Sequence, residues 1–367
     1  MRTMFSRFAR VARVLRTTFG IRVVPWFIFC GFLSLRLVVA IGMMLDNLFF
    51  PKLARTEVVS PIVLVGNPRT GTTFLQRFLS DHDIGQGQRL WRMQYPSLLI
   101  QTFLKPFLPF LEKRINPAKF HAAAAHKTSL TSVETDDVSV LFRYLDGFFL
   151  YGFFLAFDDE DLRDEFQPEV RDTSARDFAY LRSIWRRTLL AEGEKRIVGK
   201  LFSLSPRLPG FLKEFPDAKI LYMARDPLAV IPSGMSLVTG VLGKAFGFWE
   251  LDEDVRNRYL ERLYVAFVEL LRRFHTGWQD GTIDRSSVYV VRYDRMMKDF
   301  DGMMSELLPF IGHDASPELM AEIAEKAEKQ RAYVSKHKYD LEKFNLDADR
   351  IRKDCAFFYE TFLPPLD

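Results

Sequence analysis

The sequence predicts an α/β fold in which a parallel sheet is flanked by helices. Short apolar segments with the composition of buried strands alternate with longer amphipathic segments, as in parallel sheets with helical crossovers. Two of these strands run directly into polar turns that precede helices. The chain has 367 residues, 48% of them hydrophobic, which is enough for one large core with insertions or for two domains.

The expected elements begin with a strand at 62–66 and a helix at 72–80. A long helical insertion from about 84 to 190 contains a helix at 132–146 and an aromatic stretch at 148–157. The later elements are strands at 196–200, 218–224 and 287–292 and helices at 206–214, 252–275, 299–311, 316–331 and 347–362, with one more helix around Ser233. We expect two regions, an N-terminal segment (1–58) and a body (59–367) that contains the sheet.

The first strand is followed by a loop suited to binding a phosphate group. Gly66 and Gly71 have the Gly-x4-Gly spacing of a P-loop, and a helix then begins through Thr72 and Thr73. Backbone N–H groups of such a turn and of the helix N-terminus converge on one anion. Thr72 stands where a nucleotide kinase or ATPase carries lysine, and Arg69 is the cation of the loop. The loop therefore suits a phosphate-type anion other than the β- and γ-phosphates of ATP; a turn without a ligand is the alternative.

A second strand also ends in a polar turn that carries a positive charge. Arg225 and Asp226 follow the strand at 218–224, and Ser233 lies eight residues after Arg225 in the next helix. In an open α/β sheet, ligands bind at the carboxyl ends of the strands, so both turns can border one crevice. Arg225 and Ser233 would there bind a second phosphate. A local Arg225–Asp226 ion pair that closes the turn is the alternative.

These two motifs together resemble those of sulfotransferases. Pro68–Thr73 resembles their 5′-phosphosulfate loop, and Arg225–Ser233 resembles their 3′-phosphate motif. Val291–Asp294 and the segment 337–362 resemble later parts of bacterial-type members. The resemblance covers residues 60–362 and implies a P-loop-like fold. It also implies an enzyme that transfers a sulfonate group from 3′-phosphoadenosine 5′-phosphosulfate (PAPS) to a hydroxyl group without a metal.

The resemblance implies roles for individual residues of both motifs. Arg69 would stabilise the oxygen of the leaving phosphate and orient the sulfonate. The backbone and hydroxyl groups of the loop would hold the 5′-phosphate. The residues implied to bind the co-substrate are Arg69, Thr70, Gly71, Thr72, Thr73, Arg225 and Ser233.

An acidic residue near the start of the helix at 132–146 is the expected general base. Related sulfotransferases carry an acid in this region, close to the acceptor, and Glu134 is the first candidate here. Asp136 or Asp137 is the next candidate, followed by His126. Acids at a helix N-terminus also stabilise the helix dipole, so a purely structural role is the alternative.

Lys200, at the end of the strand 196–200, is implied to bind the sulfonate. In the resembled family a lysine here begins a Lys-Ser/Thr-Pro-x-His segment, but this sequence continues Leu201-Phe202-Ser203-Leu204 and lacks both the proline and the histidine. This departure removes the best histidine base. It keeps open the alternative of a non-catalytic membrane-associated protein on the same fold. A small-molecule kinase with a P-loop is the other alternative function, although Thr72 in place of lysine disfavours it.

The N-terminal segment is basic and apolar, and it predicts membrane association through residues 1–50. Residues 1–60 hold nine Lys and Arg against two acids, so the basic balance gives no argument for nucleic-acid binding by the body. Met1–Arg22 is a cationic amphipathic helix suited to an anionic membrane surface. Val23–Leu45 is long enough to span a bilayer, but Arg36 near its middle would cost about 2.5–3.5 kcal/mol. An interfacial or monotopic element is expected, with a transmembrane span or a helical hairpin packed on the body as alternatives.

The cysteine and phenylalanine residues bear on location and acceptor. The chain has two cysteines and no Asn-x-Ser/Thr site, which favours a cytoplasmic body. The aromatic insertion suggests an amphipathic or lipid-like alcohol as acceptor, with a carbohydrate as the competing class and plain core packing as the structural alternative. Its phenylalanines are Phe103, Phe107, Phe110, Phe148, Phe149, Phe153 and Phe154.

Overall fold

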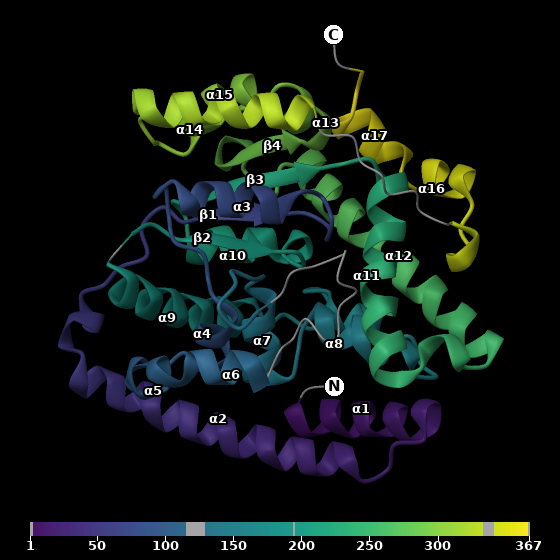
Figure 1. The fold of residues 1–367 in the computed structure, drawn as a ribbon. Coiled ribbons are helices and arrows are strands. Elements are labelled where there is room, and N and C mark those ends of the chain that lie inside the picture. The colour runs from purple at the N-terminus through teal and green to yellow at the C-terminus, as the bar shows by residue number, and fades with distance from the viewer. Residues whose placement is uncertain (1–2, 115–128, 194, 333–340, 366–367) are drawn as a thin grey trace. The chain divides into compact units, whose positions relative to one another are not determined.

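The computed structural model describes residues 3–114, 129–193, 195–332 and 341–365 (Figure 1). The chain divides into two compact units, neither of which is continuous in sequence. Unit 1 comprises Met1–Val58, Gly87–Lys195 and Met235–Ala266, and unit 2 comprises Val59–Gln86, Arg196–Gly234 and Phe267–Asp367. Two long helices, α11 (Pro227–Phe246) and α12 (Glu253–Gln279), contribute residues to both units.

Unit 2 contains a four-stranded parallel sheet in the order β2–β1–β3–β4. The strands are β1 (Ile62–Val65), β2 (Val198–Leu201), β3 (Lys219–Ala224) and β4 (Val288–Arg292). Strand β1 is wholly apolar and buried, as expected of a central parallel strand that is covered on both faces. The predicted α/β class and parallel sheet are confirmed, and the strands lie within two residues of their predicted bounds.

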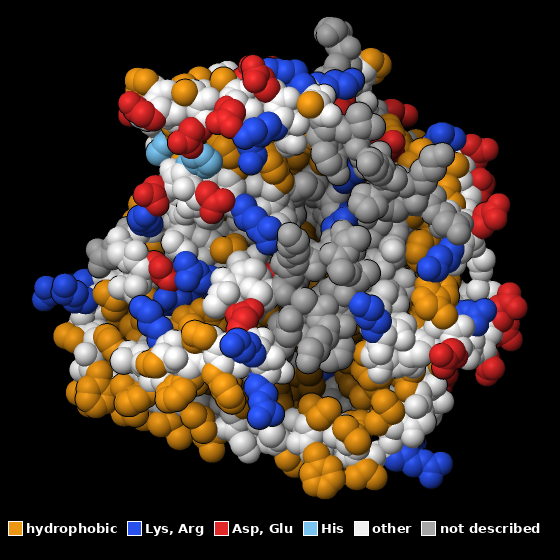
Figure 2. All heavy atoms as spheres, in the orientation of Figure 1, with side chains coloured by type: hydrophobic (Ala, Val, Ile, Leu, Met, Phe, Trp, Pro, Cys, Tyr) orange, Lys and Arg blue, Asp and Glu red, His pale blue; other side chains and the backbone are white. Residues whose placement is uncertain are grey.

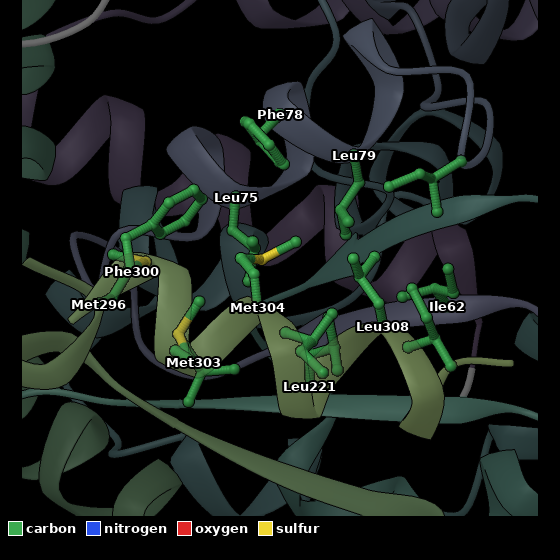
Figure 3. Packing of buried hydrophobic residues seen from close by; sticks show 14 of the residues in the cluster. Ile62, Leu75, Phe78, Leu79, Leu221, Met296, Phe300, Met303, Met304 and Leu308 are labelled. Carbon is green, nitrogen blue, oxygen red and sulfur yellow. The ribbon is translucent and has the colours of Figure 1, made fainter. Parts of the chain in front are cut away.

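Alternate side chains of β3 point to opposite faces of this sheet. Leu221 and Met223 belong to a buried cluster shared with α3 (Thr72–Asp81), α13 (Tyr293–Lys298), α14 (Phe300–Phe310) and α15 (Pro317–Arg331) (Figure 3). On the other face, Tyr222 stacks on Phe274 of α12 with ring centroids 3.3 Å apart. Because both faces are covered, the carboxyl ends of the strands are the place that the fold leaves for a ligand.

The C-terminal part of unit 2 corrects one prediction. The single helix expected at 347–362 is two helices, α16 (Ala348–Asp354) and α17 (Ala356–Phe362). The chain leaves helical geometry at Cys355, whose φ and ψ are −109° and 13°. This break brings Phe362 against Phe274, with ring centroids 5.6 Å apart, so that α17 packs on the α12 side of the sheet. Helix α10 (Leu208–Glu214), between β2 and β3 in the chain, begins two residues later than predicted.

Unit 1 is helical, and two of its helices differ from expectation. The predicted helix at 132–146 is shorter, because α7 (Asp137–Tyr144) follows a stretch of extended backbone in which Val133 pairs with Arg89. The helix α9 (Ser174–Glu192) is not among the predicted elements. Its buried residues recur every three or four positions, at Phe178, Leu181, Trp185 and Leu189, which is the ordinary spacing of an amphipathic helix.

The N-terminal helices α1 (Met4–Phe19) and α2 (Val24–Phe49) pack on the rest of unit 1 as a helical hairpin. Phe8 of α1 is buried and stacks on Phe29 of α2, with ring centroids 3.7 Å apart. Arg7 donates hydrogen bonds to the backbone carbonyls of Tyr144 and Leu145. On the apolar face of α1 that was expected to meet a membrane, Phe8 and Leu15 are therefore buried, whereas Phe5 is 60% exposed.

A buried carboxylate holds the α1 end of this hairpin. Asp146 accepts hydrogen bonds from Arg171 and Arg176 and lies 3.6 Å from the Arg7 guanidinium. Burial alone would raise the pKa of Asp146, but the hydrogen bonds from Arg171 and the charge of Arg7 hold it well below its usual range. Within the described part of the chain, two helices, α2 and α11, could cross a membrane by length and composition, and core helices pass the same test.

Candidate nucleotide-binding site

The loop between β1 and α3 turns sharply because of its two glycines. Gly66 has φ 141°, and a Cβ atom there would lie 2.9 Å from the carbonyl oxygen of Met223 on β3. Gly71 has φ 92° and precedes α3, and a Cβ atom there would lie 2.6 Å from Cε of Met296. The backbone conformation thus favours glycine at both positions, and at Gly66 the Met223 carbonyl also leaves no room for a Cβ atom.

Hydrogen bonds within unit 2 hold the loop in shape. The Nδ2 group of Asn67 donates to the carbonyl of Phe267 at 3.0 Å, and the Thr70 hydroxyl donates to the carbonyl of Asn67 at 2.9 Å. Both side chains are buried. Helix α3 then begins at Thr72, and the first amides of a helix have no acceptor within it. The amides of Thr72 and Thr73 are therefore suited to an anion bound at this end of α3.

Arg69 has a backbone conformation that is unusual for its residue type. Its φ of 75° lies in the left-handed region, which residues with a Cβ atom rarely adopt. Its carbonyl accepts a hydrogen bond from Nη1 of Arg225 at 2.7 Å, and its Nε donates to the Ser233 hydroxyl at 3.0 Å. The structure thus brings together three residues that the sequence analysis took from two distant motifs.

Arg225 is further held by an aromatic ring that the sequence analysis did not select. The Arg225 guanidinium lies 3.9 Å from the ring centroid of Tyr293, the first residue of α13. The same ring would lie 3.1 Å from a Cβ atom on Gly71, so it borders both motifs. Its position directly after β4, at the same sheet edge as the two turns, becomes informative only when the strand order is known.

Asp226 is hydrogen-bonded to groups other than Arg225, although an ion pair between these two residues was the simpler explanation of this motif. Its carboxylate accepts hydrogen bonds from the Tyr359 hydroxyl at 2.5 Å and from the amide of Leu228 at 2.9 Å. Burial and this hydrogen bond to Asp226 raise the pKa of Tyr359 above its usual value, so Tyr359 remains a neutral donor. The alternative of a local Arg225–Asp226 ion pair is therefore wrong, and Asp226 instead ties α17 to the turn after β3.

Lys200 reaches the loop from the neighbouring strand. It pairs in register with Leu64 of β1, and its side chain is only 1% exposed. Its Nζ lies 3.4 Å from the Thr73 hydroxyl and 5.5 Å from the ring centroid of Phe202. The strand pairing therefore places this ammonium group at the first turn of α3.

The candidate general base belongs to unit 1. Glu134 is buried, its Oε1 accepts a hydrogen bond from Ser132 at 2.8 Å, and its amide donates to the carbonyl of Gln88. It precedes α7 and does not open the helix. The phosphate loop belongs to unit 2, so the role of Glu134 as the general base stays a prediction.

The two other acidic candidates for the general base accept hydrogen bonds from neighbouring side chains. The Asp136 carboxylate accepts from the Trp185 indole at 2.9 Å, and the Asp137 carboxylate accepts from the Thr135 hydroxyl at 2.7 Å. His126 lies outside the described residues. Among the residues that the structure describes, no group of three or more His, Cys, Asp and Glu side chains could hold a metal ion.

Comparison with known proteins connects this geometry to a family. A model of the sulfotransferase family matches residues 61–317. The chain is 24% identical, over 281 residues, to the omega-hydroxy-beta-dihydromenaquinone-9 sulfotransferases Stf3 of Mycobacterium bovis and Mycobacterium tuberculosis, a match that covers 74% of this chain and 68% of each relative.

Two solved structures share the fold. Sulfotransferase STF9 from Mycobacterium avium has a TM-score of 0.69 at 17% identity, covering 89% of this chain and 82% of that one. Sulfotransferase STF1 from Mycobacterium tuberculosis has a TM-score of 0.66 at 18% identity, covering 96% of this chain and 92% of that one. The family match spans more than half of the sequence and includes both motifs. The alternatives of a small-molecule kinase and of a non-catalytic protein are therefore wrong. This chain is an enzyme of the sulfotransferase family.

Proposed function

We propose that this enzyme transfers the sulfonate group of PAPS to a hydroxyl group of a lipid-like acceptor by in-line displacement. The observation that carries the proposal is the interlocked group of Arg69, Arg225 and Ser233 at the carboxyl edge of the sheet. Two guanidinium groups and the first amides of α3 supply positive potential around one loop. This suits a molecule that carries two separate anionic groups, as PAPS does at its 5′ and 3′ positions.

In this proposal each group of the site would bind one part of PAPS. The amides of Thr72 and Thr73 would hold the 5′-phosphate, with the Arg69 side chain directed to its bridging oxygen. Arg225 and Ser233 would hold the 3′-phosphate. The buried Lys200 ammonium, beside Thr73, would contact a sulfonate oxygen.

In the proposed reaction the protein itself forms no covalent bond. The acceptor hydroxyl oxygen forms a bond to sulfur while the bond from sulfur to the bridging 5′-phosphate oxygen breaks, and that oxygen keeps the electron pair. Arg69 and Lys200 would stabilise the charge that develops on the leaving oxygen and the sulfonate. The acceptor proton would pass to a carboxylate, for which Glu134 is the candidate. No step requires a metal ion.

The acceptor class is proposed from the relatives and from the aromatic insertion. The Stf3 relatives are named for an omega-hydroxylated dihydromenaquinone, which is an isoprenoid lipid that carries a hydroxyl group. In this chain, α8 (Phe148–Phe153) carries half-buried phenylalanines, and its rings of Phe149 and Phe153 stack 6.1 Å apart. Aromatic and aliphatic surfaces of this kind suit an isoprenoid or acyl chain better than a sugar.

A transfer assay tests this function. The full-length protein in mild detergent is incubated with PAPS and an omega-hydroxylated isoprenoid quinone, with EDTA present, and mass spectrometry follows the sulfated product and 3′-phosphoadenosine 5′-phosphate. Stoichiometric formation of both is expected from the wild type and from Arg352→Ala, an exposed arginine on α16, but not from Arg69→Ala. Product from a sugar alcohol alone would contradict the acceptor class. Binding of 3′-phosphoadenosine 5′-phosphate without turnover of any alcohol would contradict the proposed reaction.

A further inference from the structure

Helix α2 turns its charged residues inward and its apolar residues outward. Its two charged side chains, Arg36 and Asp46, are half-buried and fully buried, respectively. Most of its 26 residues are exposed, and the exposed residues are almost all apolar. The large exposed side chains are Val24, Trp26, Phe27, Ile28, Leu33, Leu37, Val38, Ile41, Met44, Leu48 and Phe49. A helix that faced water would show the reverse pattern.

The few polar side chains on the exposed side of α2 satisfy their hydrogen bonds within the helix. The Ser34 hydroxyl donates to the carbonyl of Cys30 at 3.0 Å. The Asn47 amide donates to the carbonyls of Met43 and Met44 at 3.4 Å. Self-satisfied side chains of this kind are compatible with an apolar surrounding, where polar groups have no water to bond to.

The inner side of α2 is fixed to unit 1 by a buried carboxylate. Asp46 accepts hydrogen bonds from Arg187 at 2.7 Å and from the amides of Leu98 and Leu99 at 3.1 and 2.9 Å. These two amides are the first of α5 (Leu98–Leu104), so the carboxylate also caps that helix. A Cβ atom on Gly42 would lie 2.7 Å from the Ser97 hydroxyl oxygen, which shows how closely α2 and α5 approach. To cross a bilayer, α2 would have to break this buried ion pair or take α5 with it.

The segment next to α2 adds three exposed aromatic rings. Phe103, Phe107 and Phe110 are 69%, 61% and 60% exposed, and they lie four and three residues apart along α5, η2 (Lys105–Phe107) and α6 (Leu108–Arg114). Figure 2 shows the hydrophobic side chains gathered over α2 and α5. These rings were expected from the sequence to contribute to an acceptor pocket or a core. Their exposure argues against both.

Exposed basic residues border these apolar side chains. Arg22 precedes α2, and Lys52 and Arg55 follow it directly. Lys105 and Lys113 lie between and after the three phenylalanines and are also exposed. Apolar side chains bordered by cations match a membrane with anionic headgroups, because the rings enter the acyl boundary while the cations stay at headgroup level.

We propose that the exposed side of α2, together with Phe103, Phe107 and Phe110, is a membrane-docking surface that binds an anionic phospholipid bilayer with α2 lying in the plane of the membrane. The proposal makes the chain monotopic and assigns part of the membrane contact to the insertion. It does not depend on the proposed reaction, because none of these residues belongs to the nucleotide-binding site.

A vesicle-binding experiment tests the surface. Full-length protein is mixed with sucrose-loaded vesicles of phosphatidylcholine alone or with phosphatidylglycerol and then sedimented. Tight binding that is stronger to the anionic vesicles is expected, with a loss of about tenfold or more for the combined Phe103→Ala, Phe107→Ala and Phe110→Ala variant. The combined Val170→Ala and Met320→Ala variant, which removes exposed apolar side chains elsewhere, should bind as the wild type does. Unchanged binding of the phenylalanine variant, or a dimer that forms in place of vesicle binding, would overturn the proposal.

A depth measurement tests the orientation of α2. Single nitroxide labels are placed by Phe27→Cys, Leu37→Cys or Leu48→Cys in a Cys30→Ser background, while the buried Cys355 stays unlabelled. The outer two positions are about 30 Å apart along a helix, the thickness of the hydrocarbon core. An in-plane helix predicts the same shallow depth for all three labels. A deep label at Leu37→Cys with shallow labels at both ends would show a transmembrane span and overturn the proposal.

Discussion

Arg225 donates a hydrogen bond from Nη1 to the backbone carbonyl of Arg69 at 2.7 Å. The residue proposed to bind the 3′-phosphate of PAPS thus also fixes the backbone of the loop proposed to bind the 5′-phosphate. The contact joins the turns that follow β1 and β3, which are adjacent strands of the sheet. Changes at Arg225 should therefore alter the affinity for both ends of the nucleotide.

Replacing Arg225 with lysine should weaken binding of 3′-phosphoadenosine 5′-phosphate by roughly ten- to a hundredfold. A lysine keeps the charge but cannot both donate to the Arg69 carbonyl and stack on the Tyr293 ring. Isothermal titration calorimetry without magnesium measures the change, and Tyr293→Leu should show a smaller loss because only the stacking is removed. Equal affinity of Arg225→Lys and the wild type would contradict the assigned contacts.

The left-handed backbone of Arg69 predicts a difference between two variants that lack the same side chain. Arg69→Gly should be more stable than Arg69→Ala by about 1 kcal/mol, because glycine adopts a φ of 75° without steric cost. Both variants should lose sulfonate transfer by about a hundredfold or more, since neither carries the guanidinium. Denaturant unfolding and the transfer assay give the two quantities. Equal stabilities would show that the loop relaxes when the side chain is lost.

Replacing Lys200 with methionine should reduce kcat without unfolding the protein. Methionine fills a similar volume in a site where the lysine is 1% exposed, and denaturant unfolding of the variant checks that the fold is kept. We expect kcat to fall about a hundredfold, while affinity for 3′-phosphoadenosine 5′-phosphate changes much less, because this product lacks the sulfonate. A loss of product affinity with kcat preserved would instead make Lys200 a ligand of the nucleotide.

The buried pair of Asp46 and Arg187 should be important for the stability of unit 1. Asp46→Asn leaves the Arg187 guanidinium buried without its counter-charge and should cost about 3–5 kcal/mol in unfolding free energy. Arg187→Met added to Asp46→Asn should restore part of this loss, because the uncompensated charge is then gone. Denaturant unfolding in mild detergent of the two single variants and the double variant gives the coupling. Losses that simply add would indicate that the two residues do not interact.

Glu306 is expected to make a small, pH-dependent contribution to the free energy of unfolding. Hydrogen bonds from Arg295 and Tyr289 lower the pKa of Glu306 from 4.5 to about 2. Its contribution is therefore complete above pH 4.5 and is lost as the pH falls through about 2. Because the side chain is half-exposed, the effect should stay below about 1 kcal/mol. Wild type and Glu306→Gln should therefore differ in urea midpoint at pH 5 and converge as the pH falls, whereas a constant difference would exclude this titration.

The sheet and the phosphate loop could be predicted from sequence because short-range patterns determine both. A continuous apolar run identifies β1, and the spacing of Gly66 and Gly71 identifies the turn that follows it. The order of the strands places the turns after β1 and β3 at one edge, and this brings Arg69 and Arg225 together. Tyr293 was passed over because a tyrosine after a strand has no distinctive local pattern, and only the sheet order gives it a neighbour.

The insertion and the N-terminal helices were less predictable because long-range contacts determine them. The start of α7 depends on Val133 pairing with Arg89, more than forty residues earlier in the chain. The direction of Phe103, Phe107 and Phe110 could not be read from their composition, since a buried and an exposed aromatic stripe have the same helical spacing. The inward Asp46 has its partner, Arg187, on α9, a helix that is not predicted from the sequence.

The discontinuous make-up of unit 1 bears on how a water-soluble form of this enzyme can be made. Deleting the N-terminal helices would remove the counter-charge of Arg187 and the cap of α5, and it would uncover the apolar residues beneath α1 and α2. The hairpin is part of the folded enzyme and cannot be treated as a detachable anchor. A detergent-free variant is therefore better sought by placing glutamate and lysine at the outward positions of α2, with Gly42 and Asp46 left unchanged.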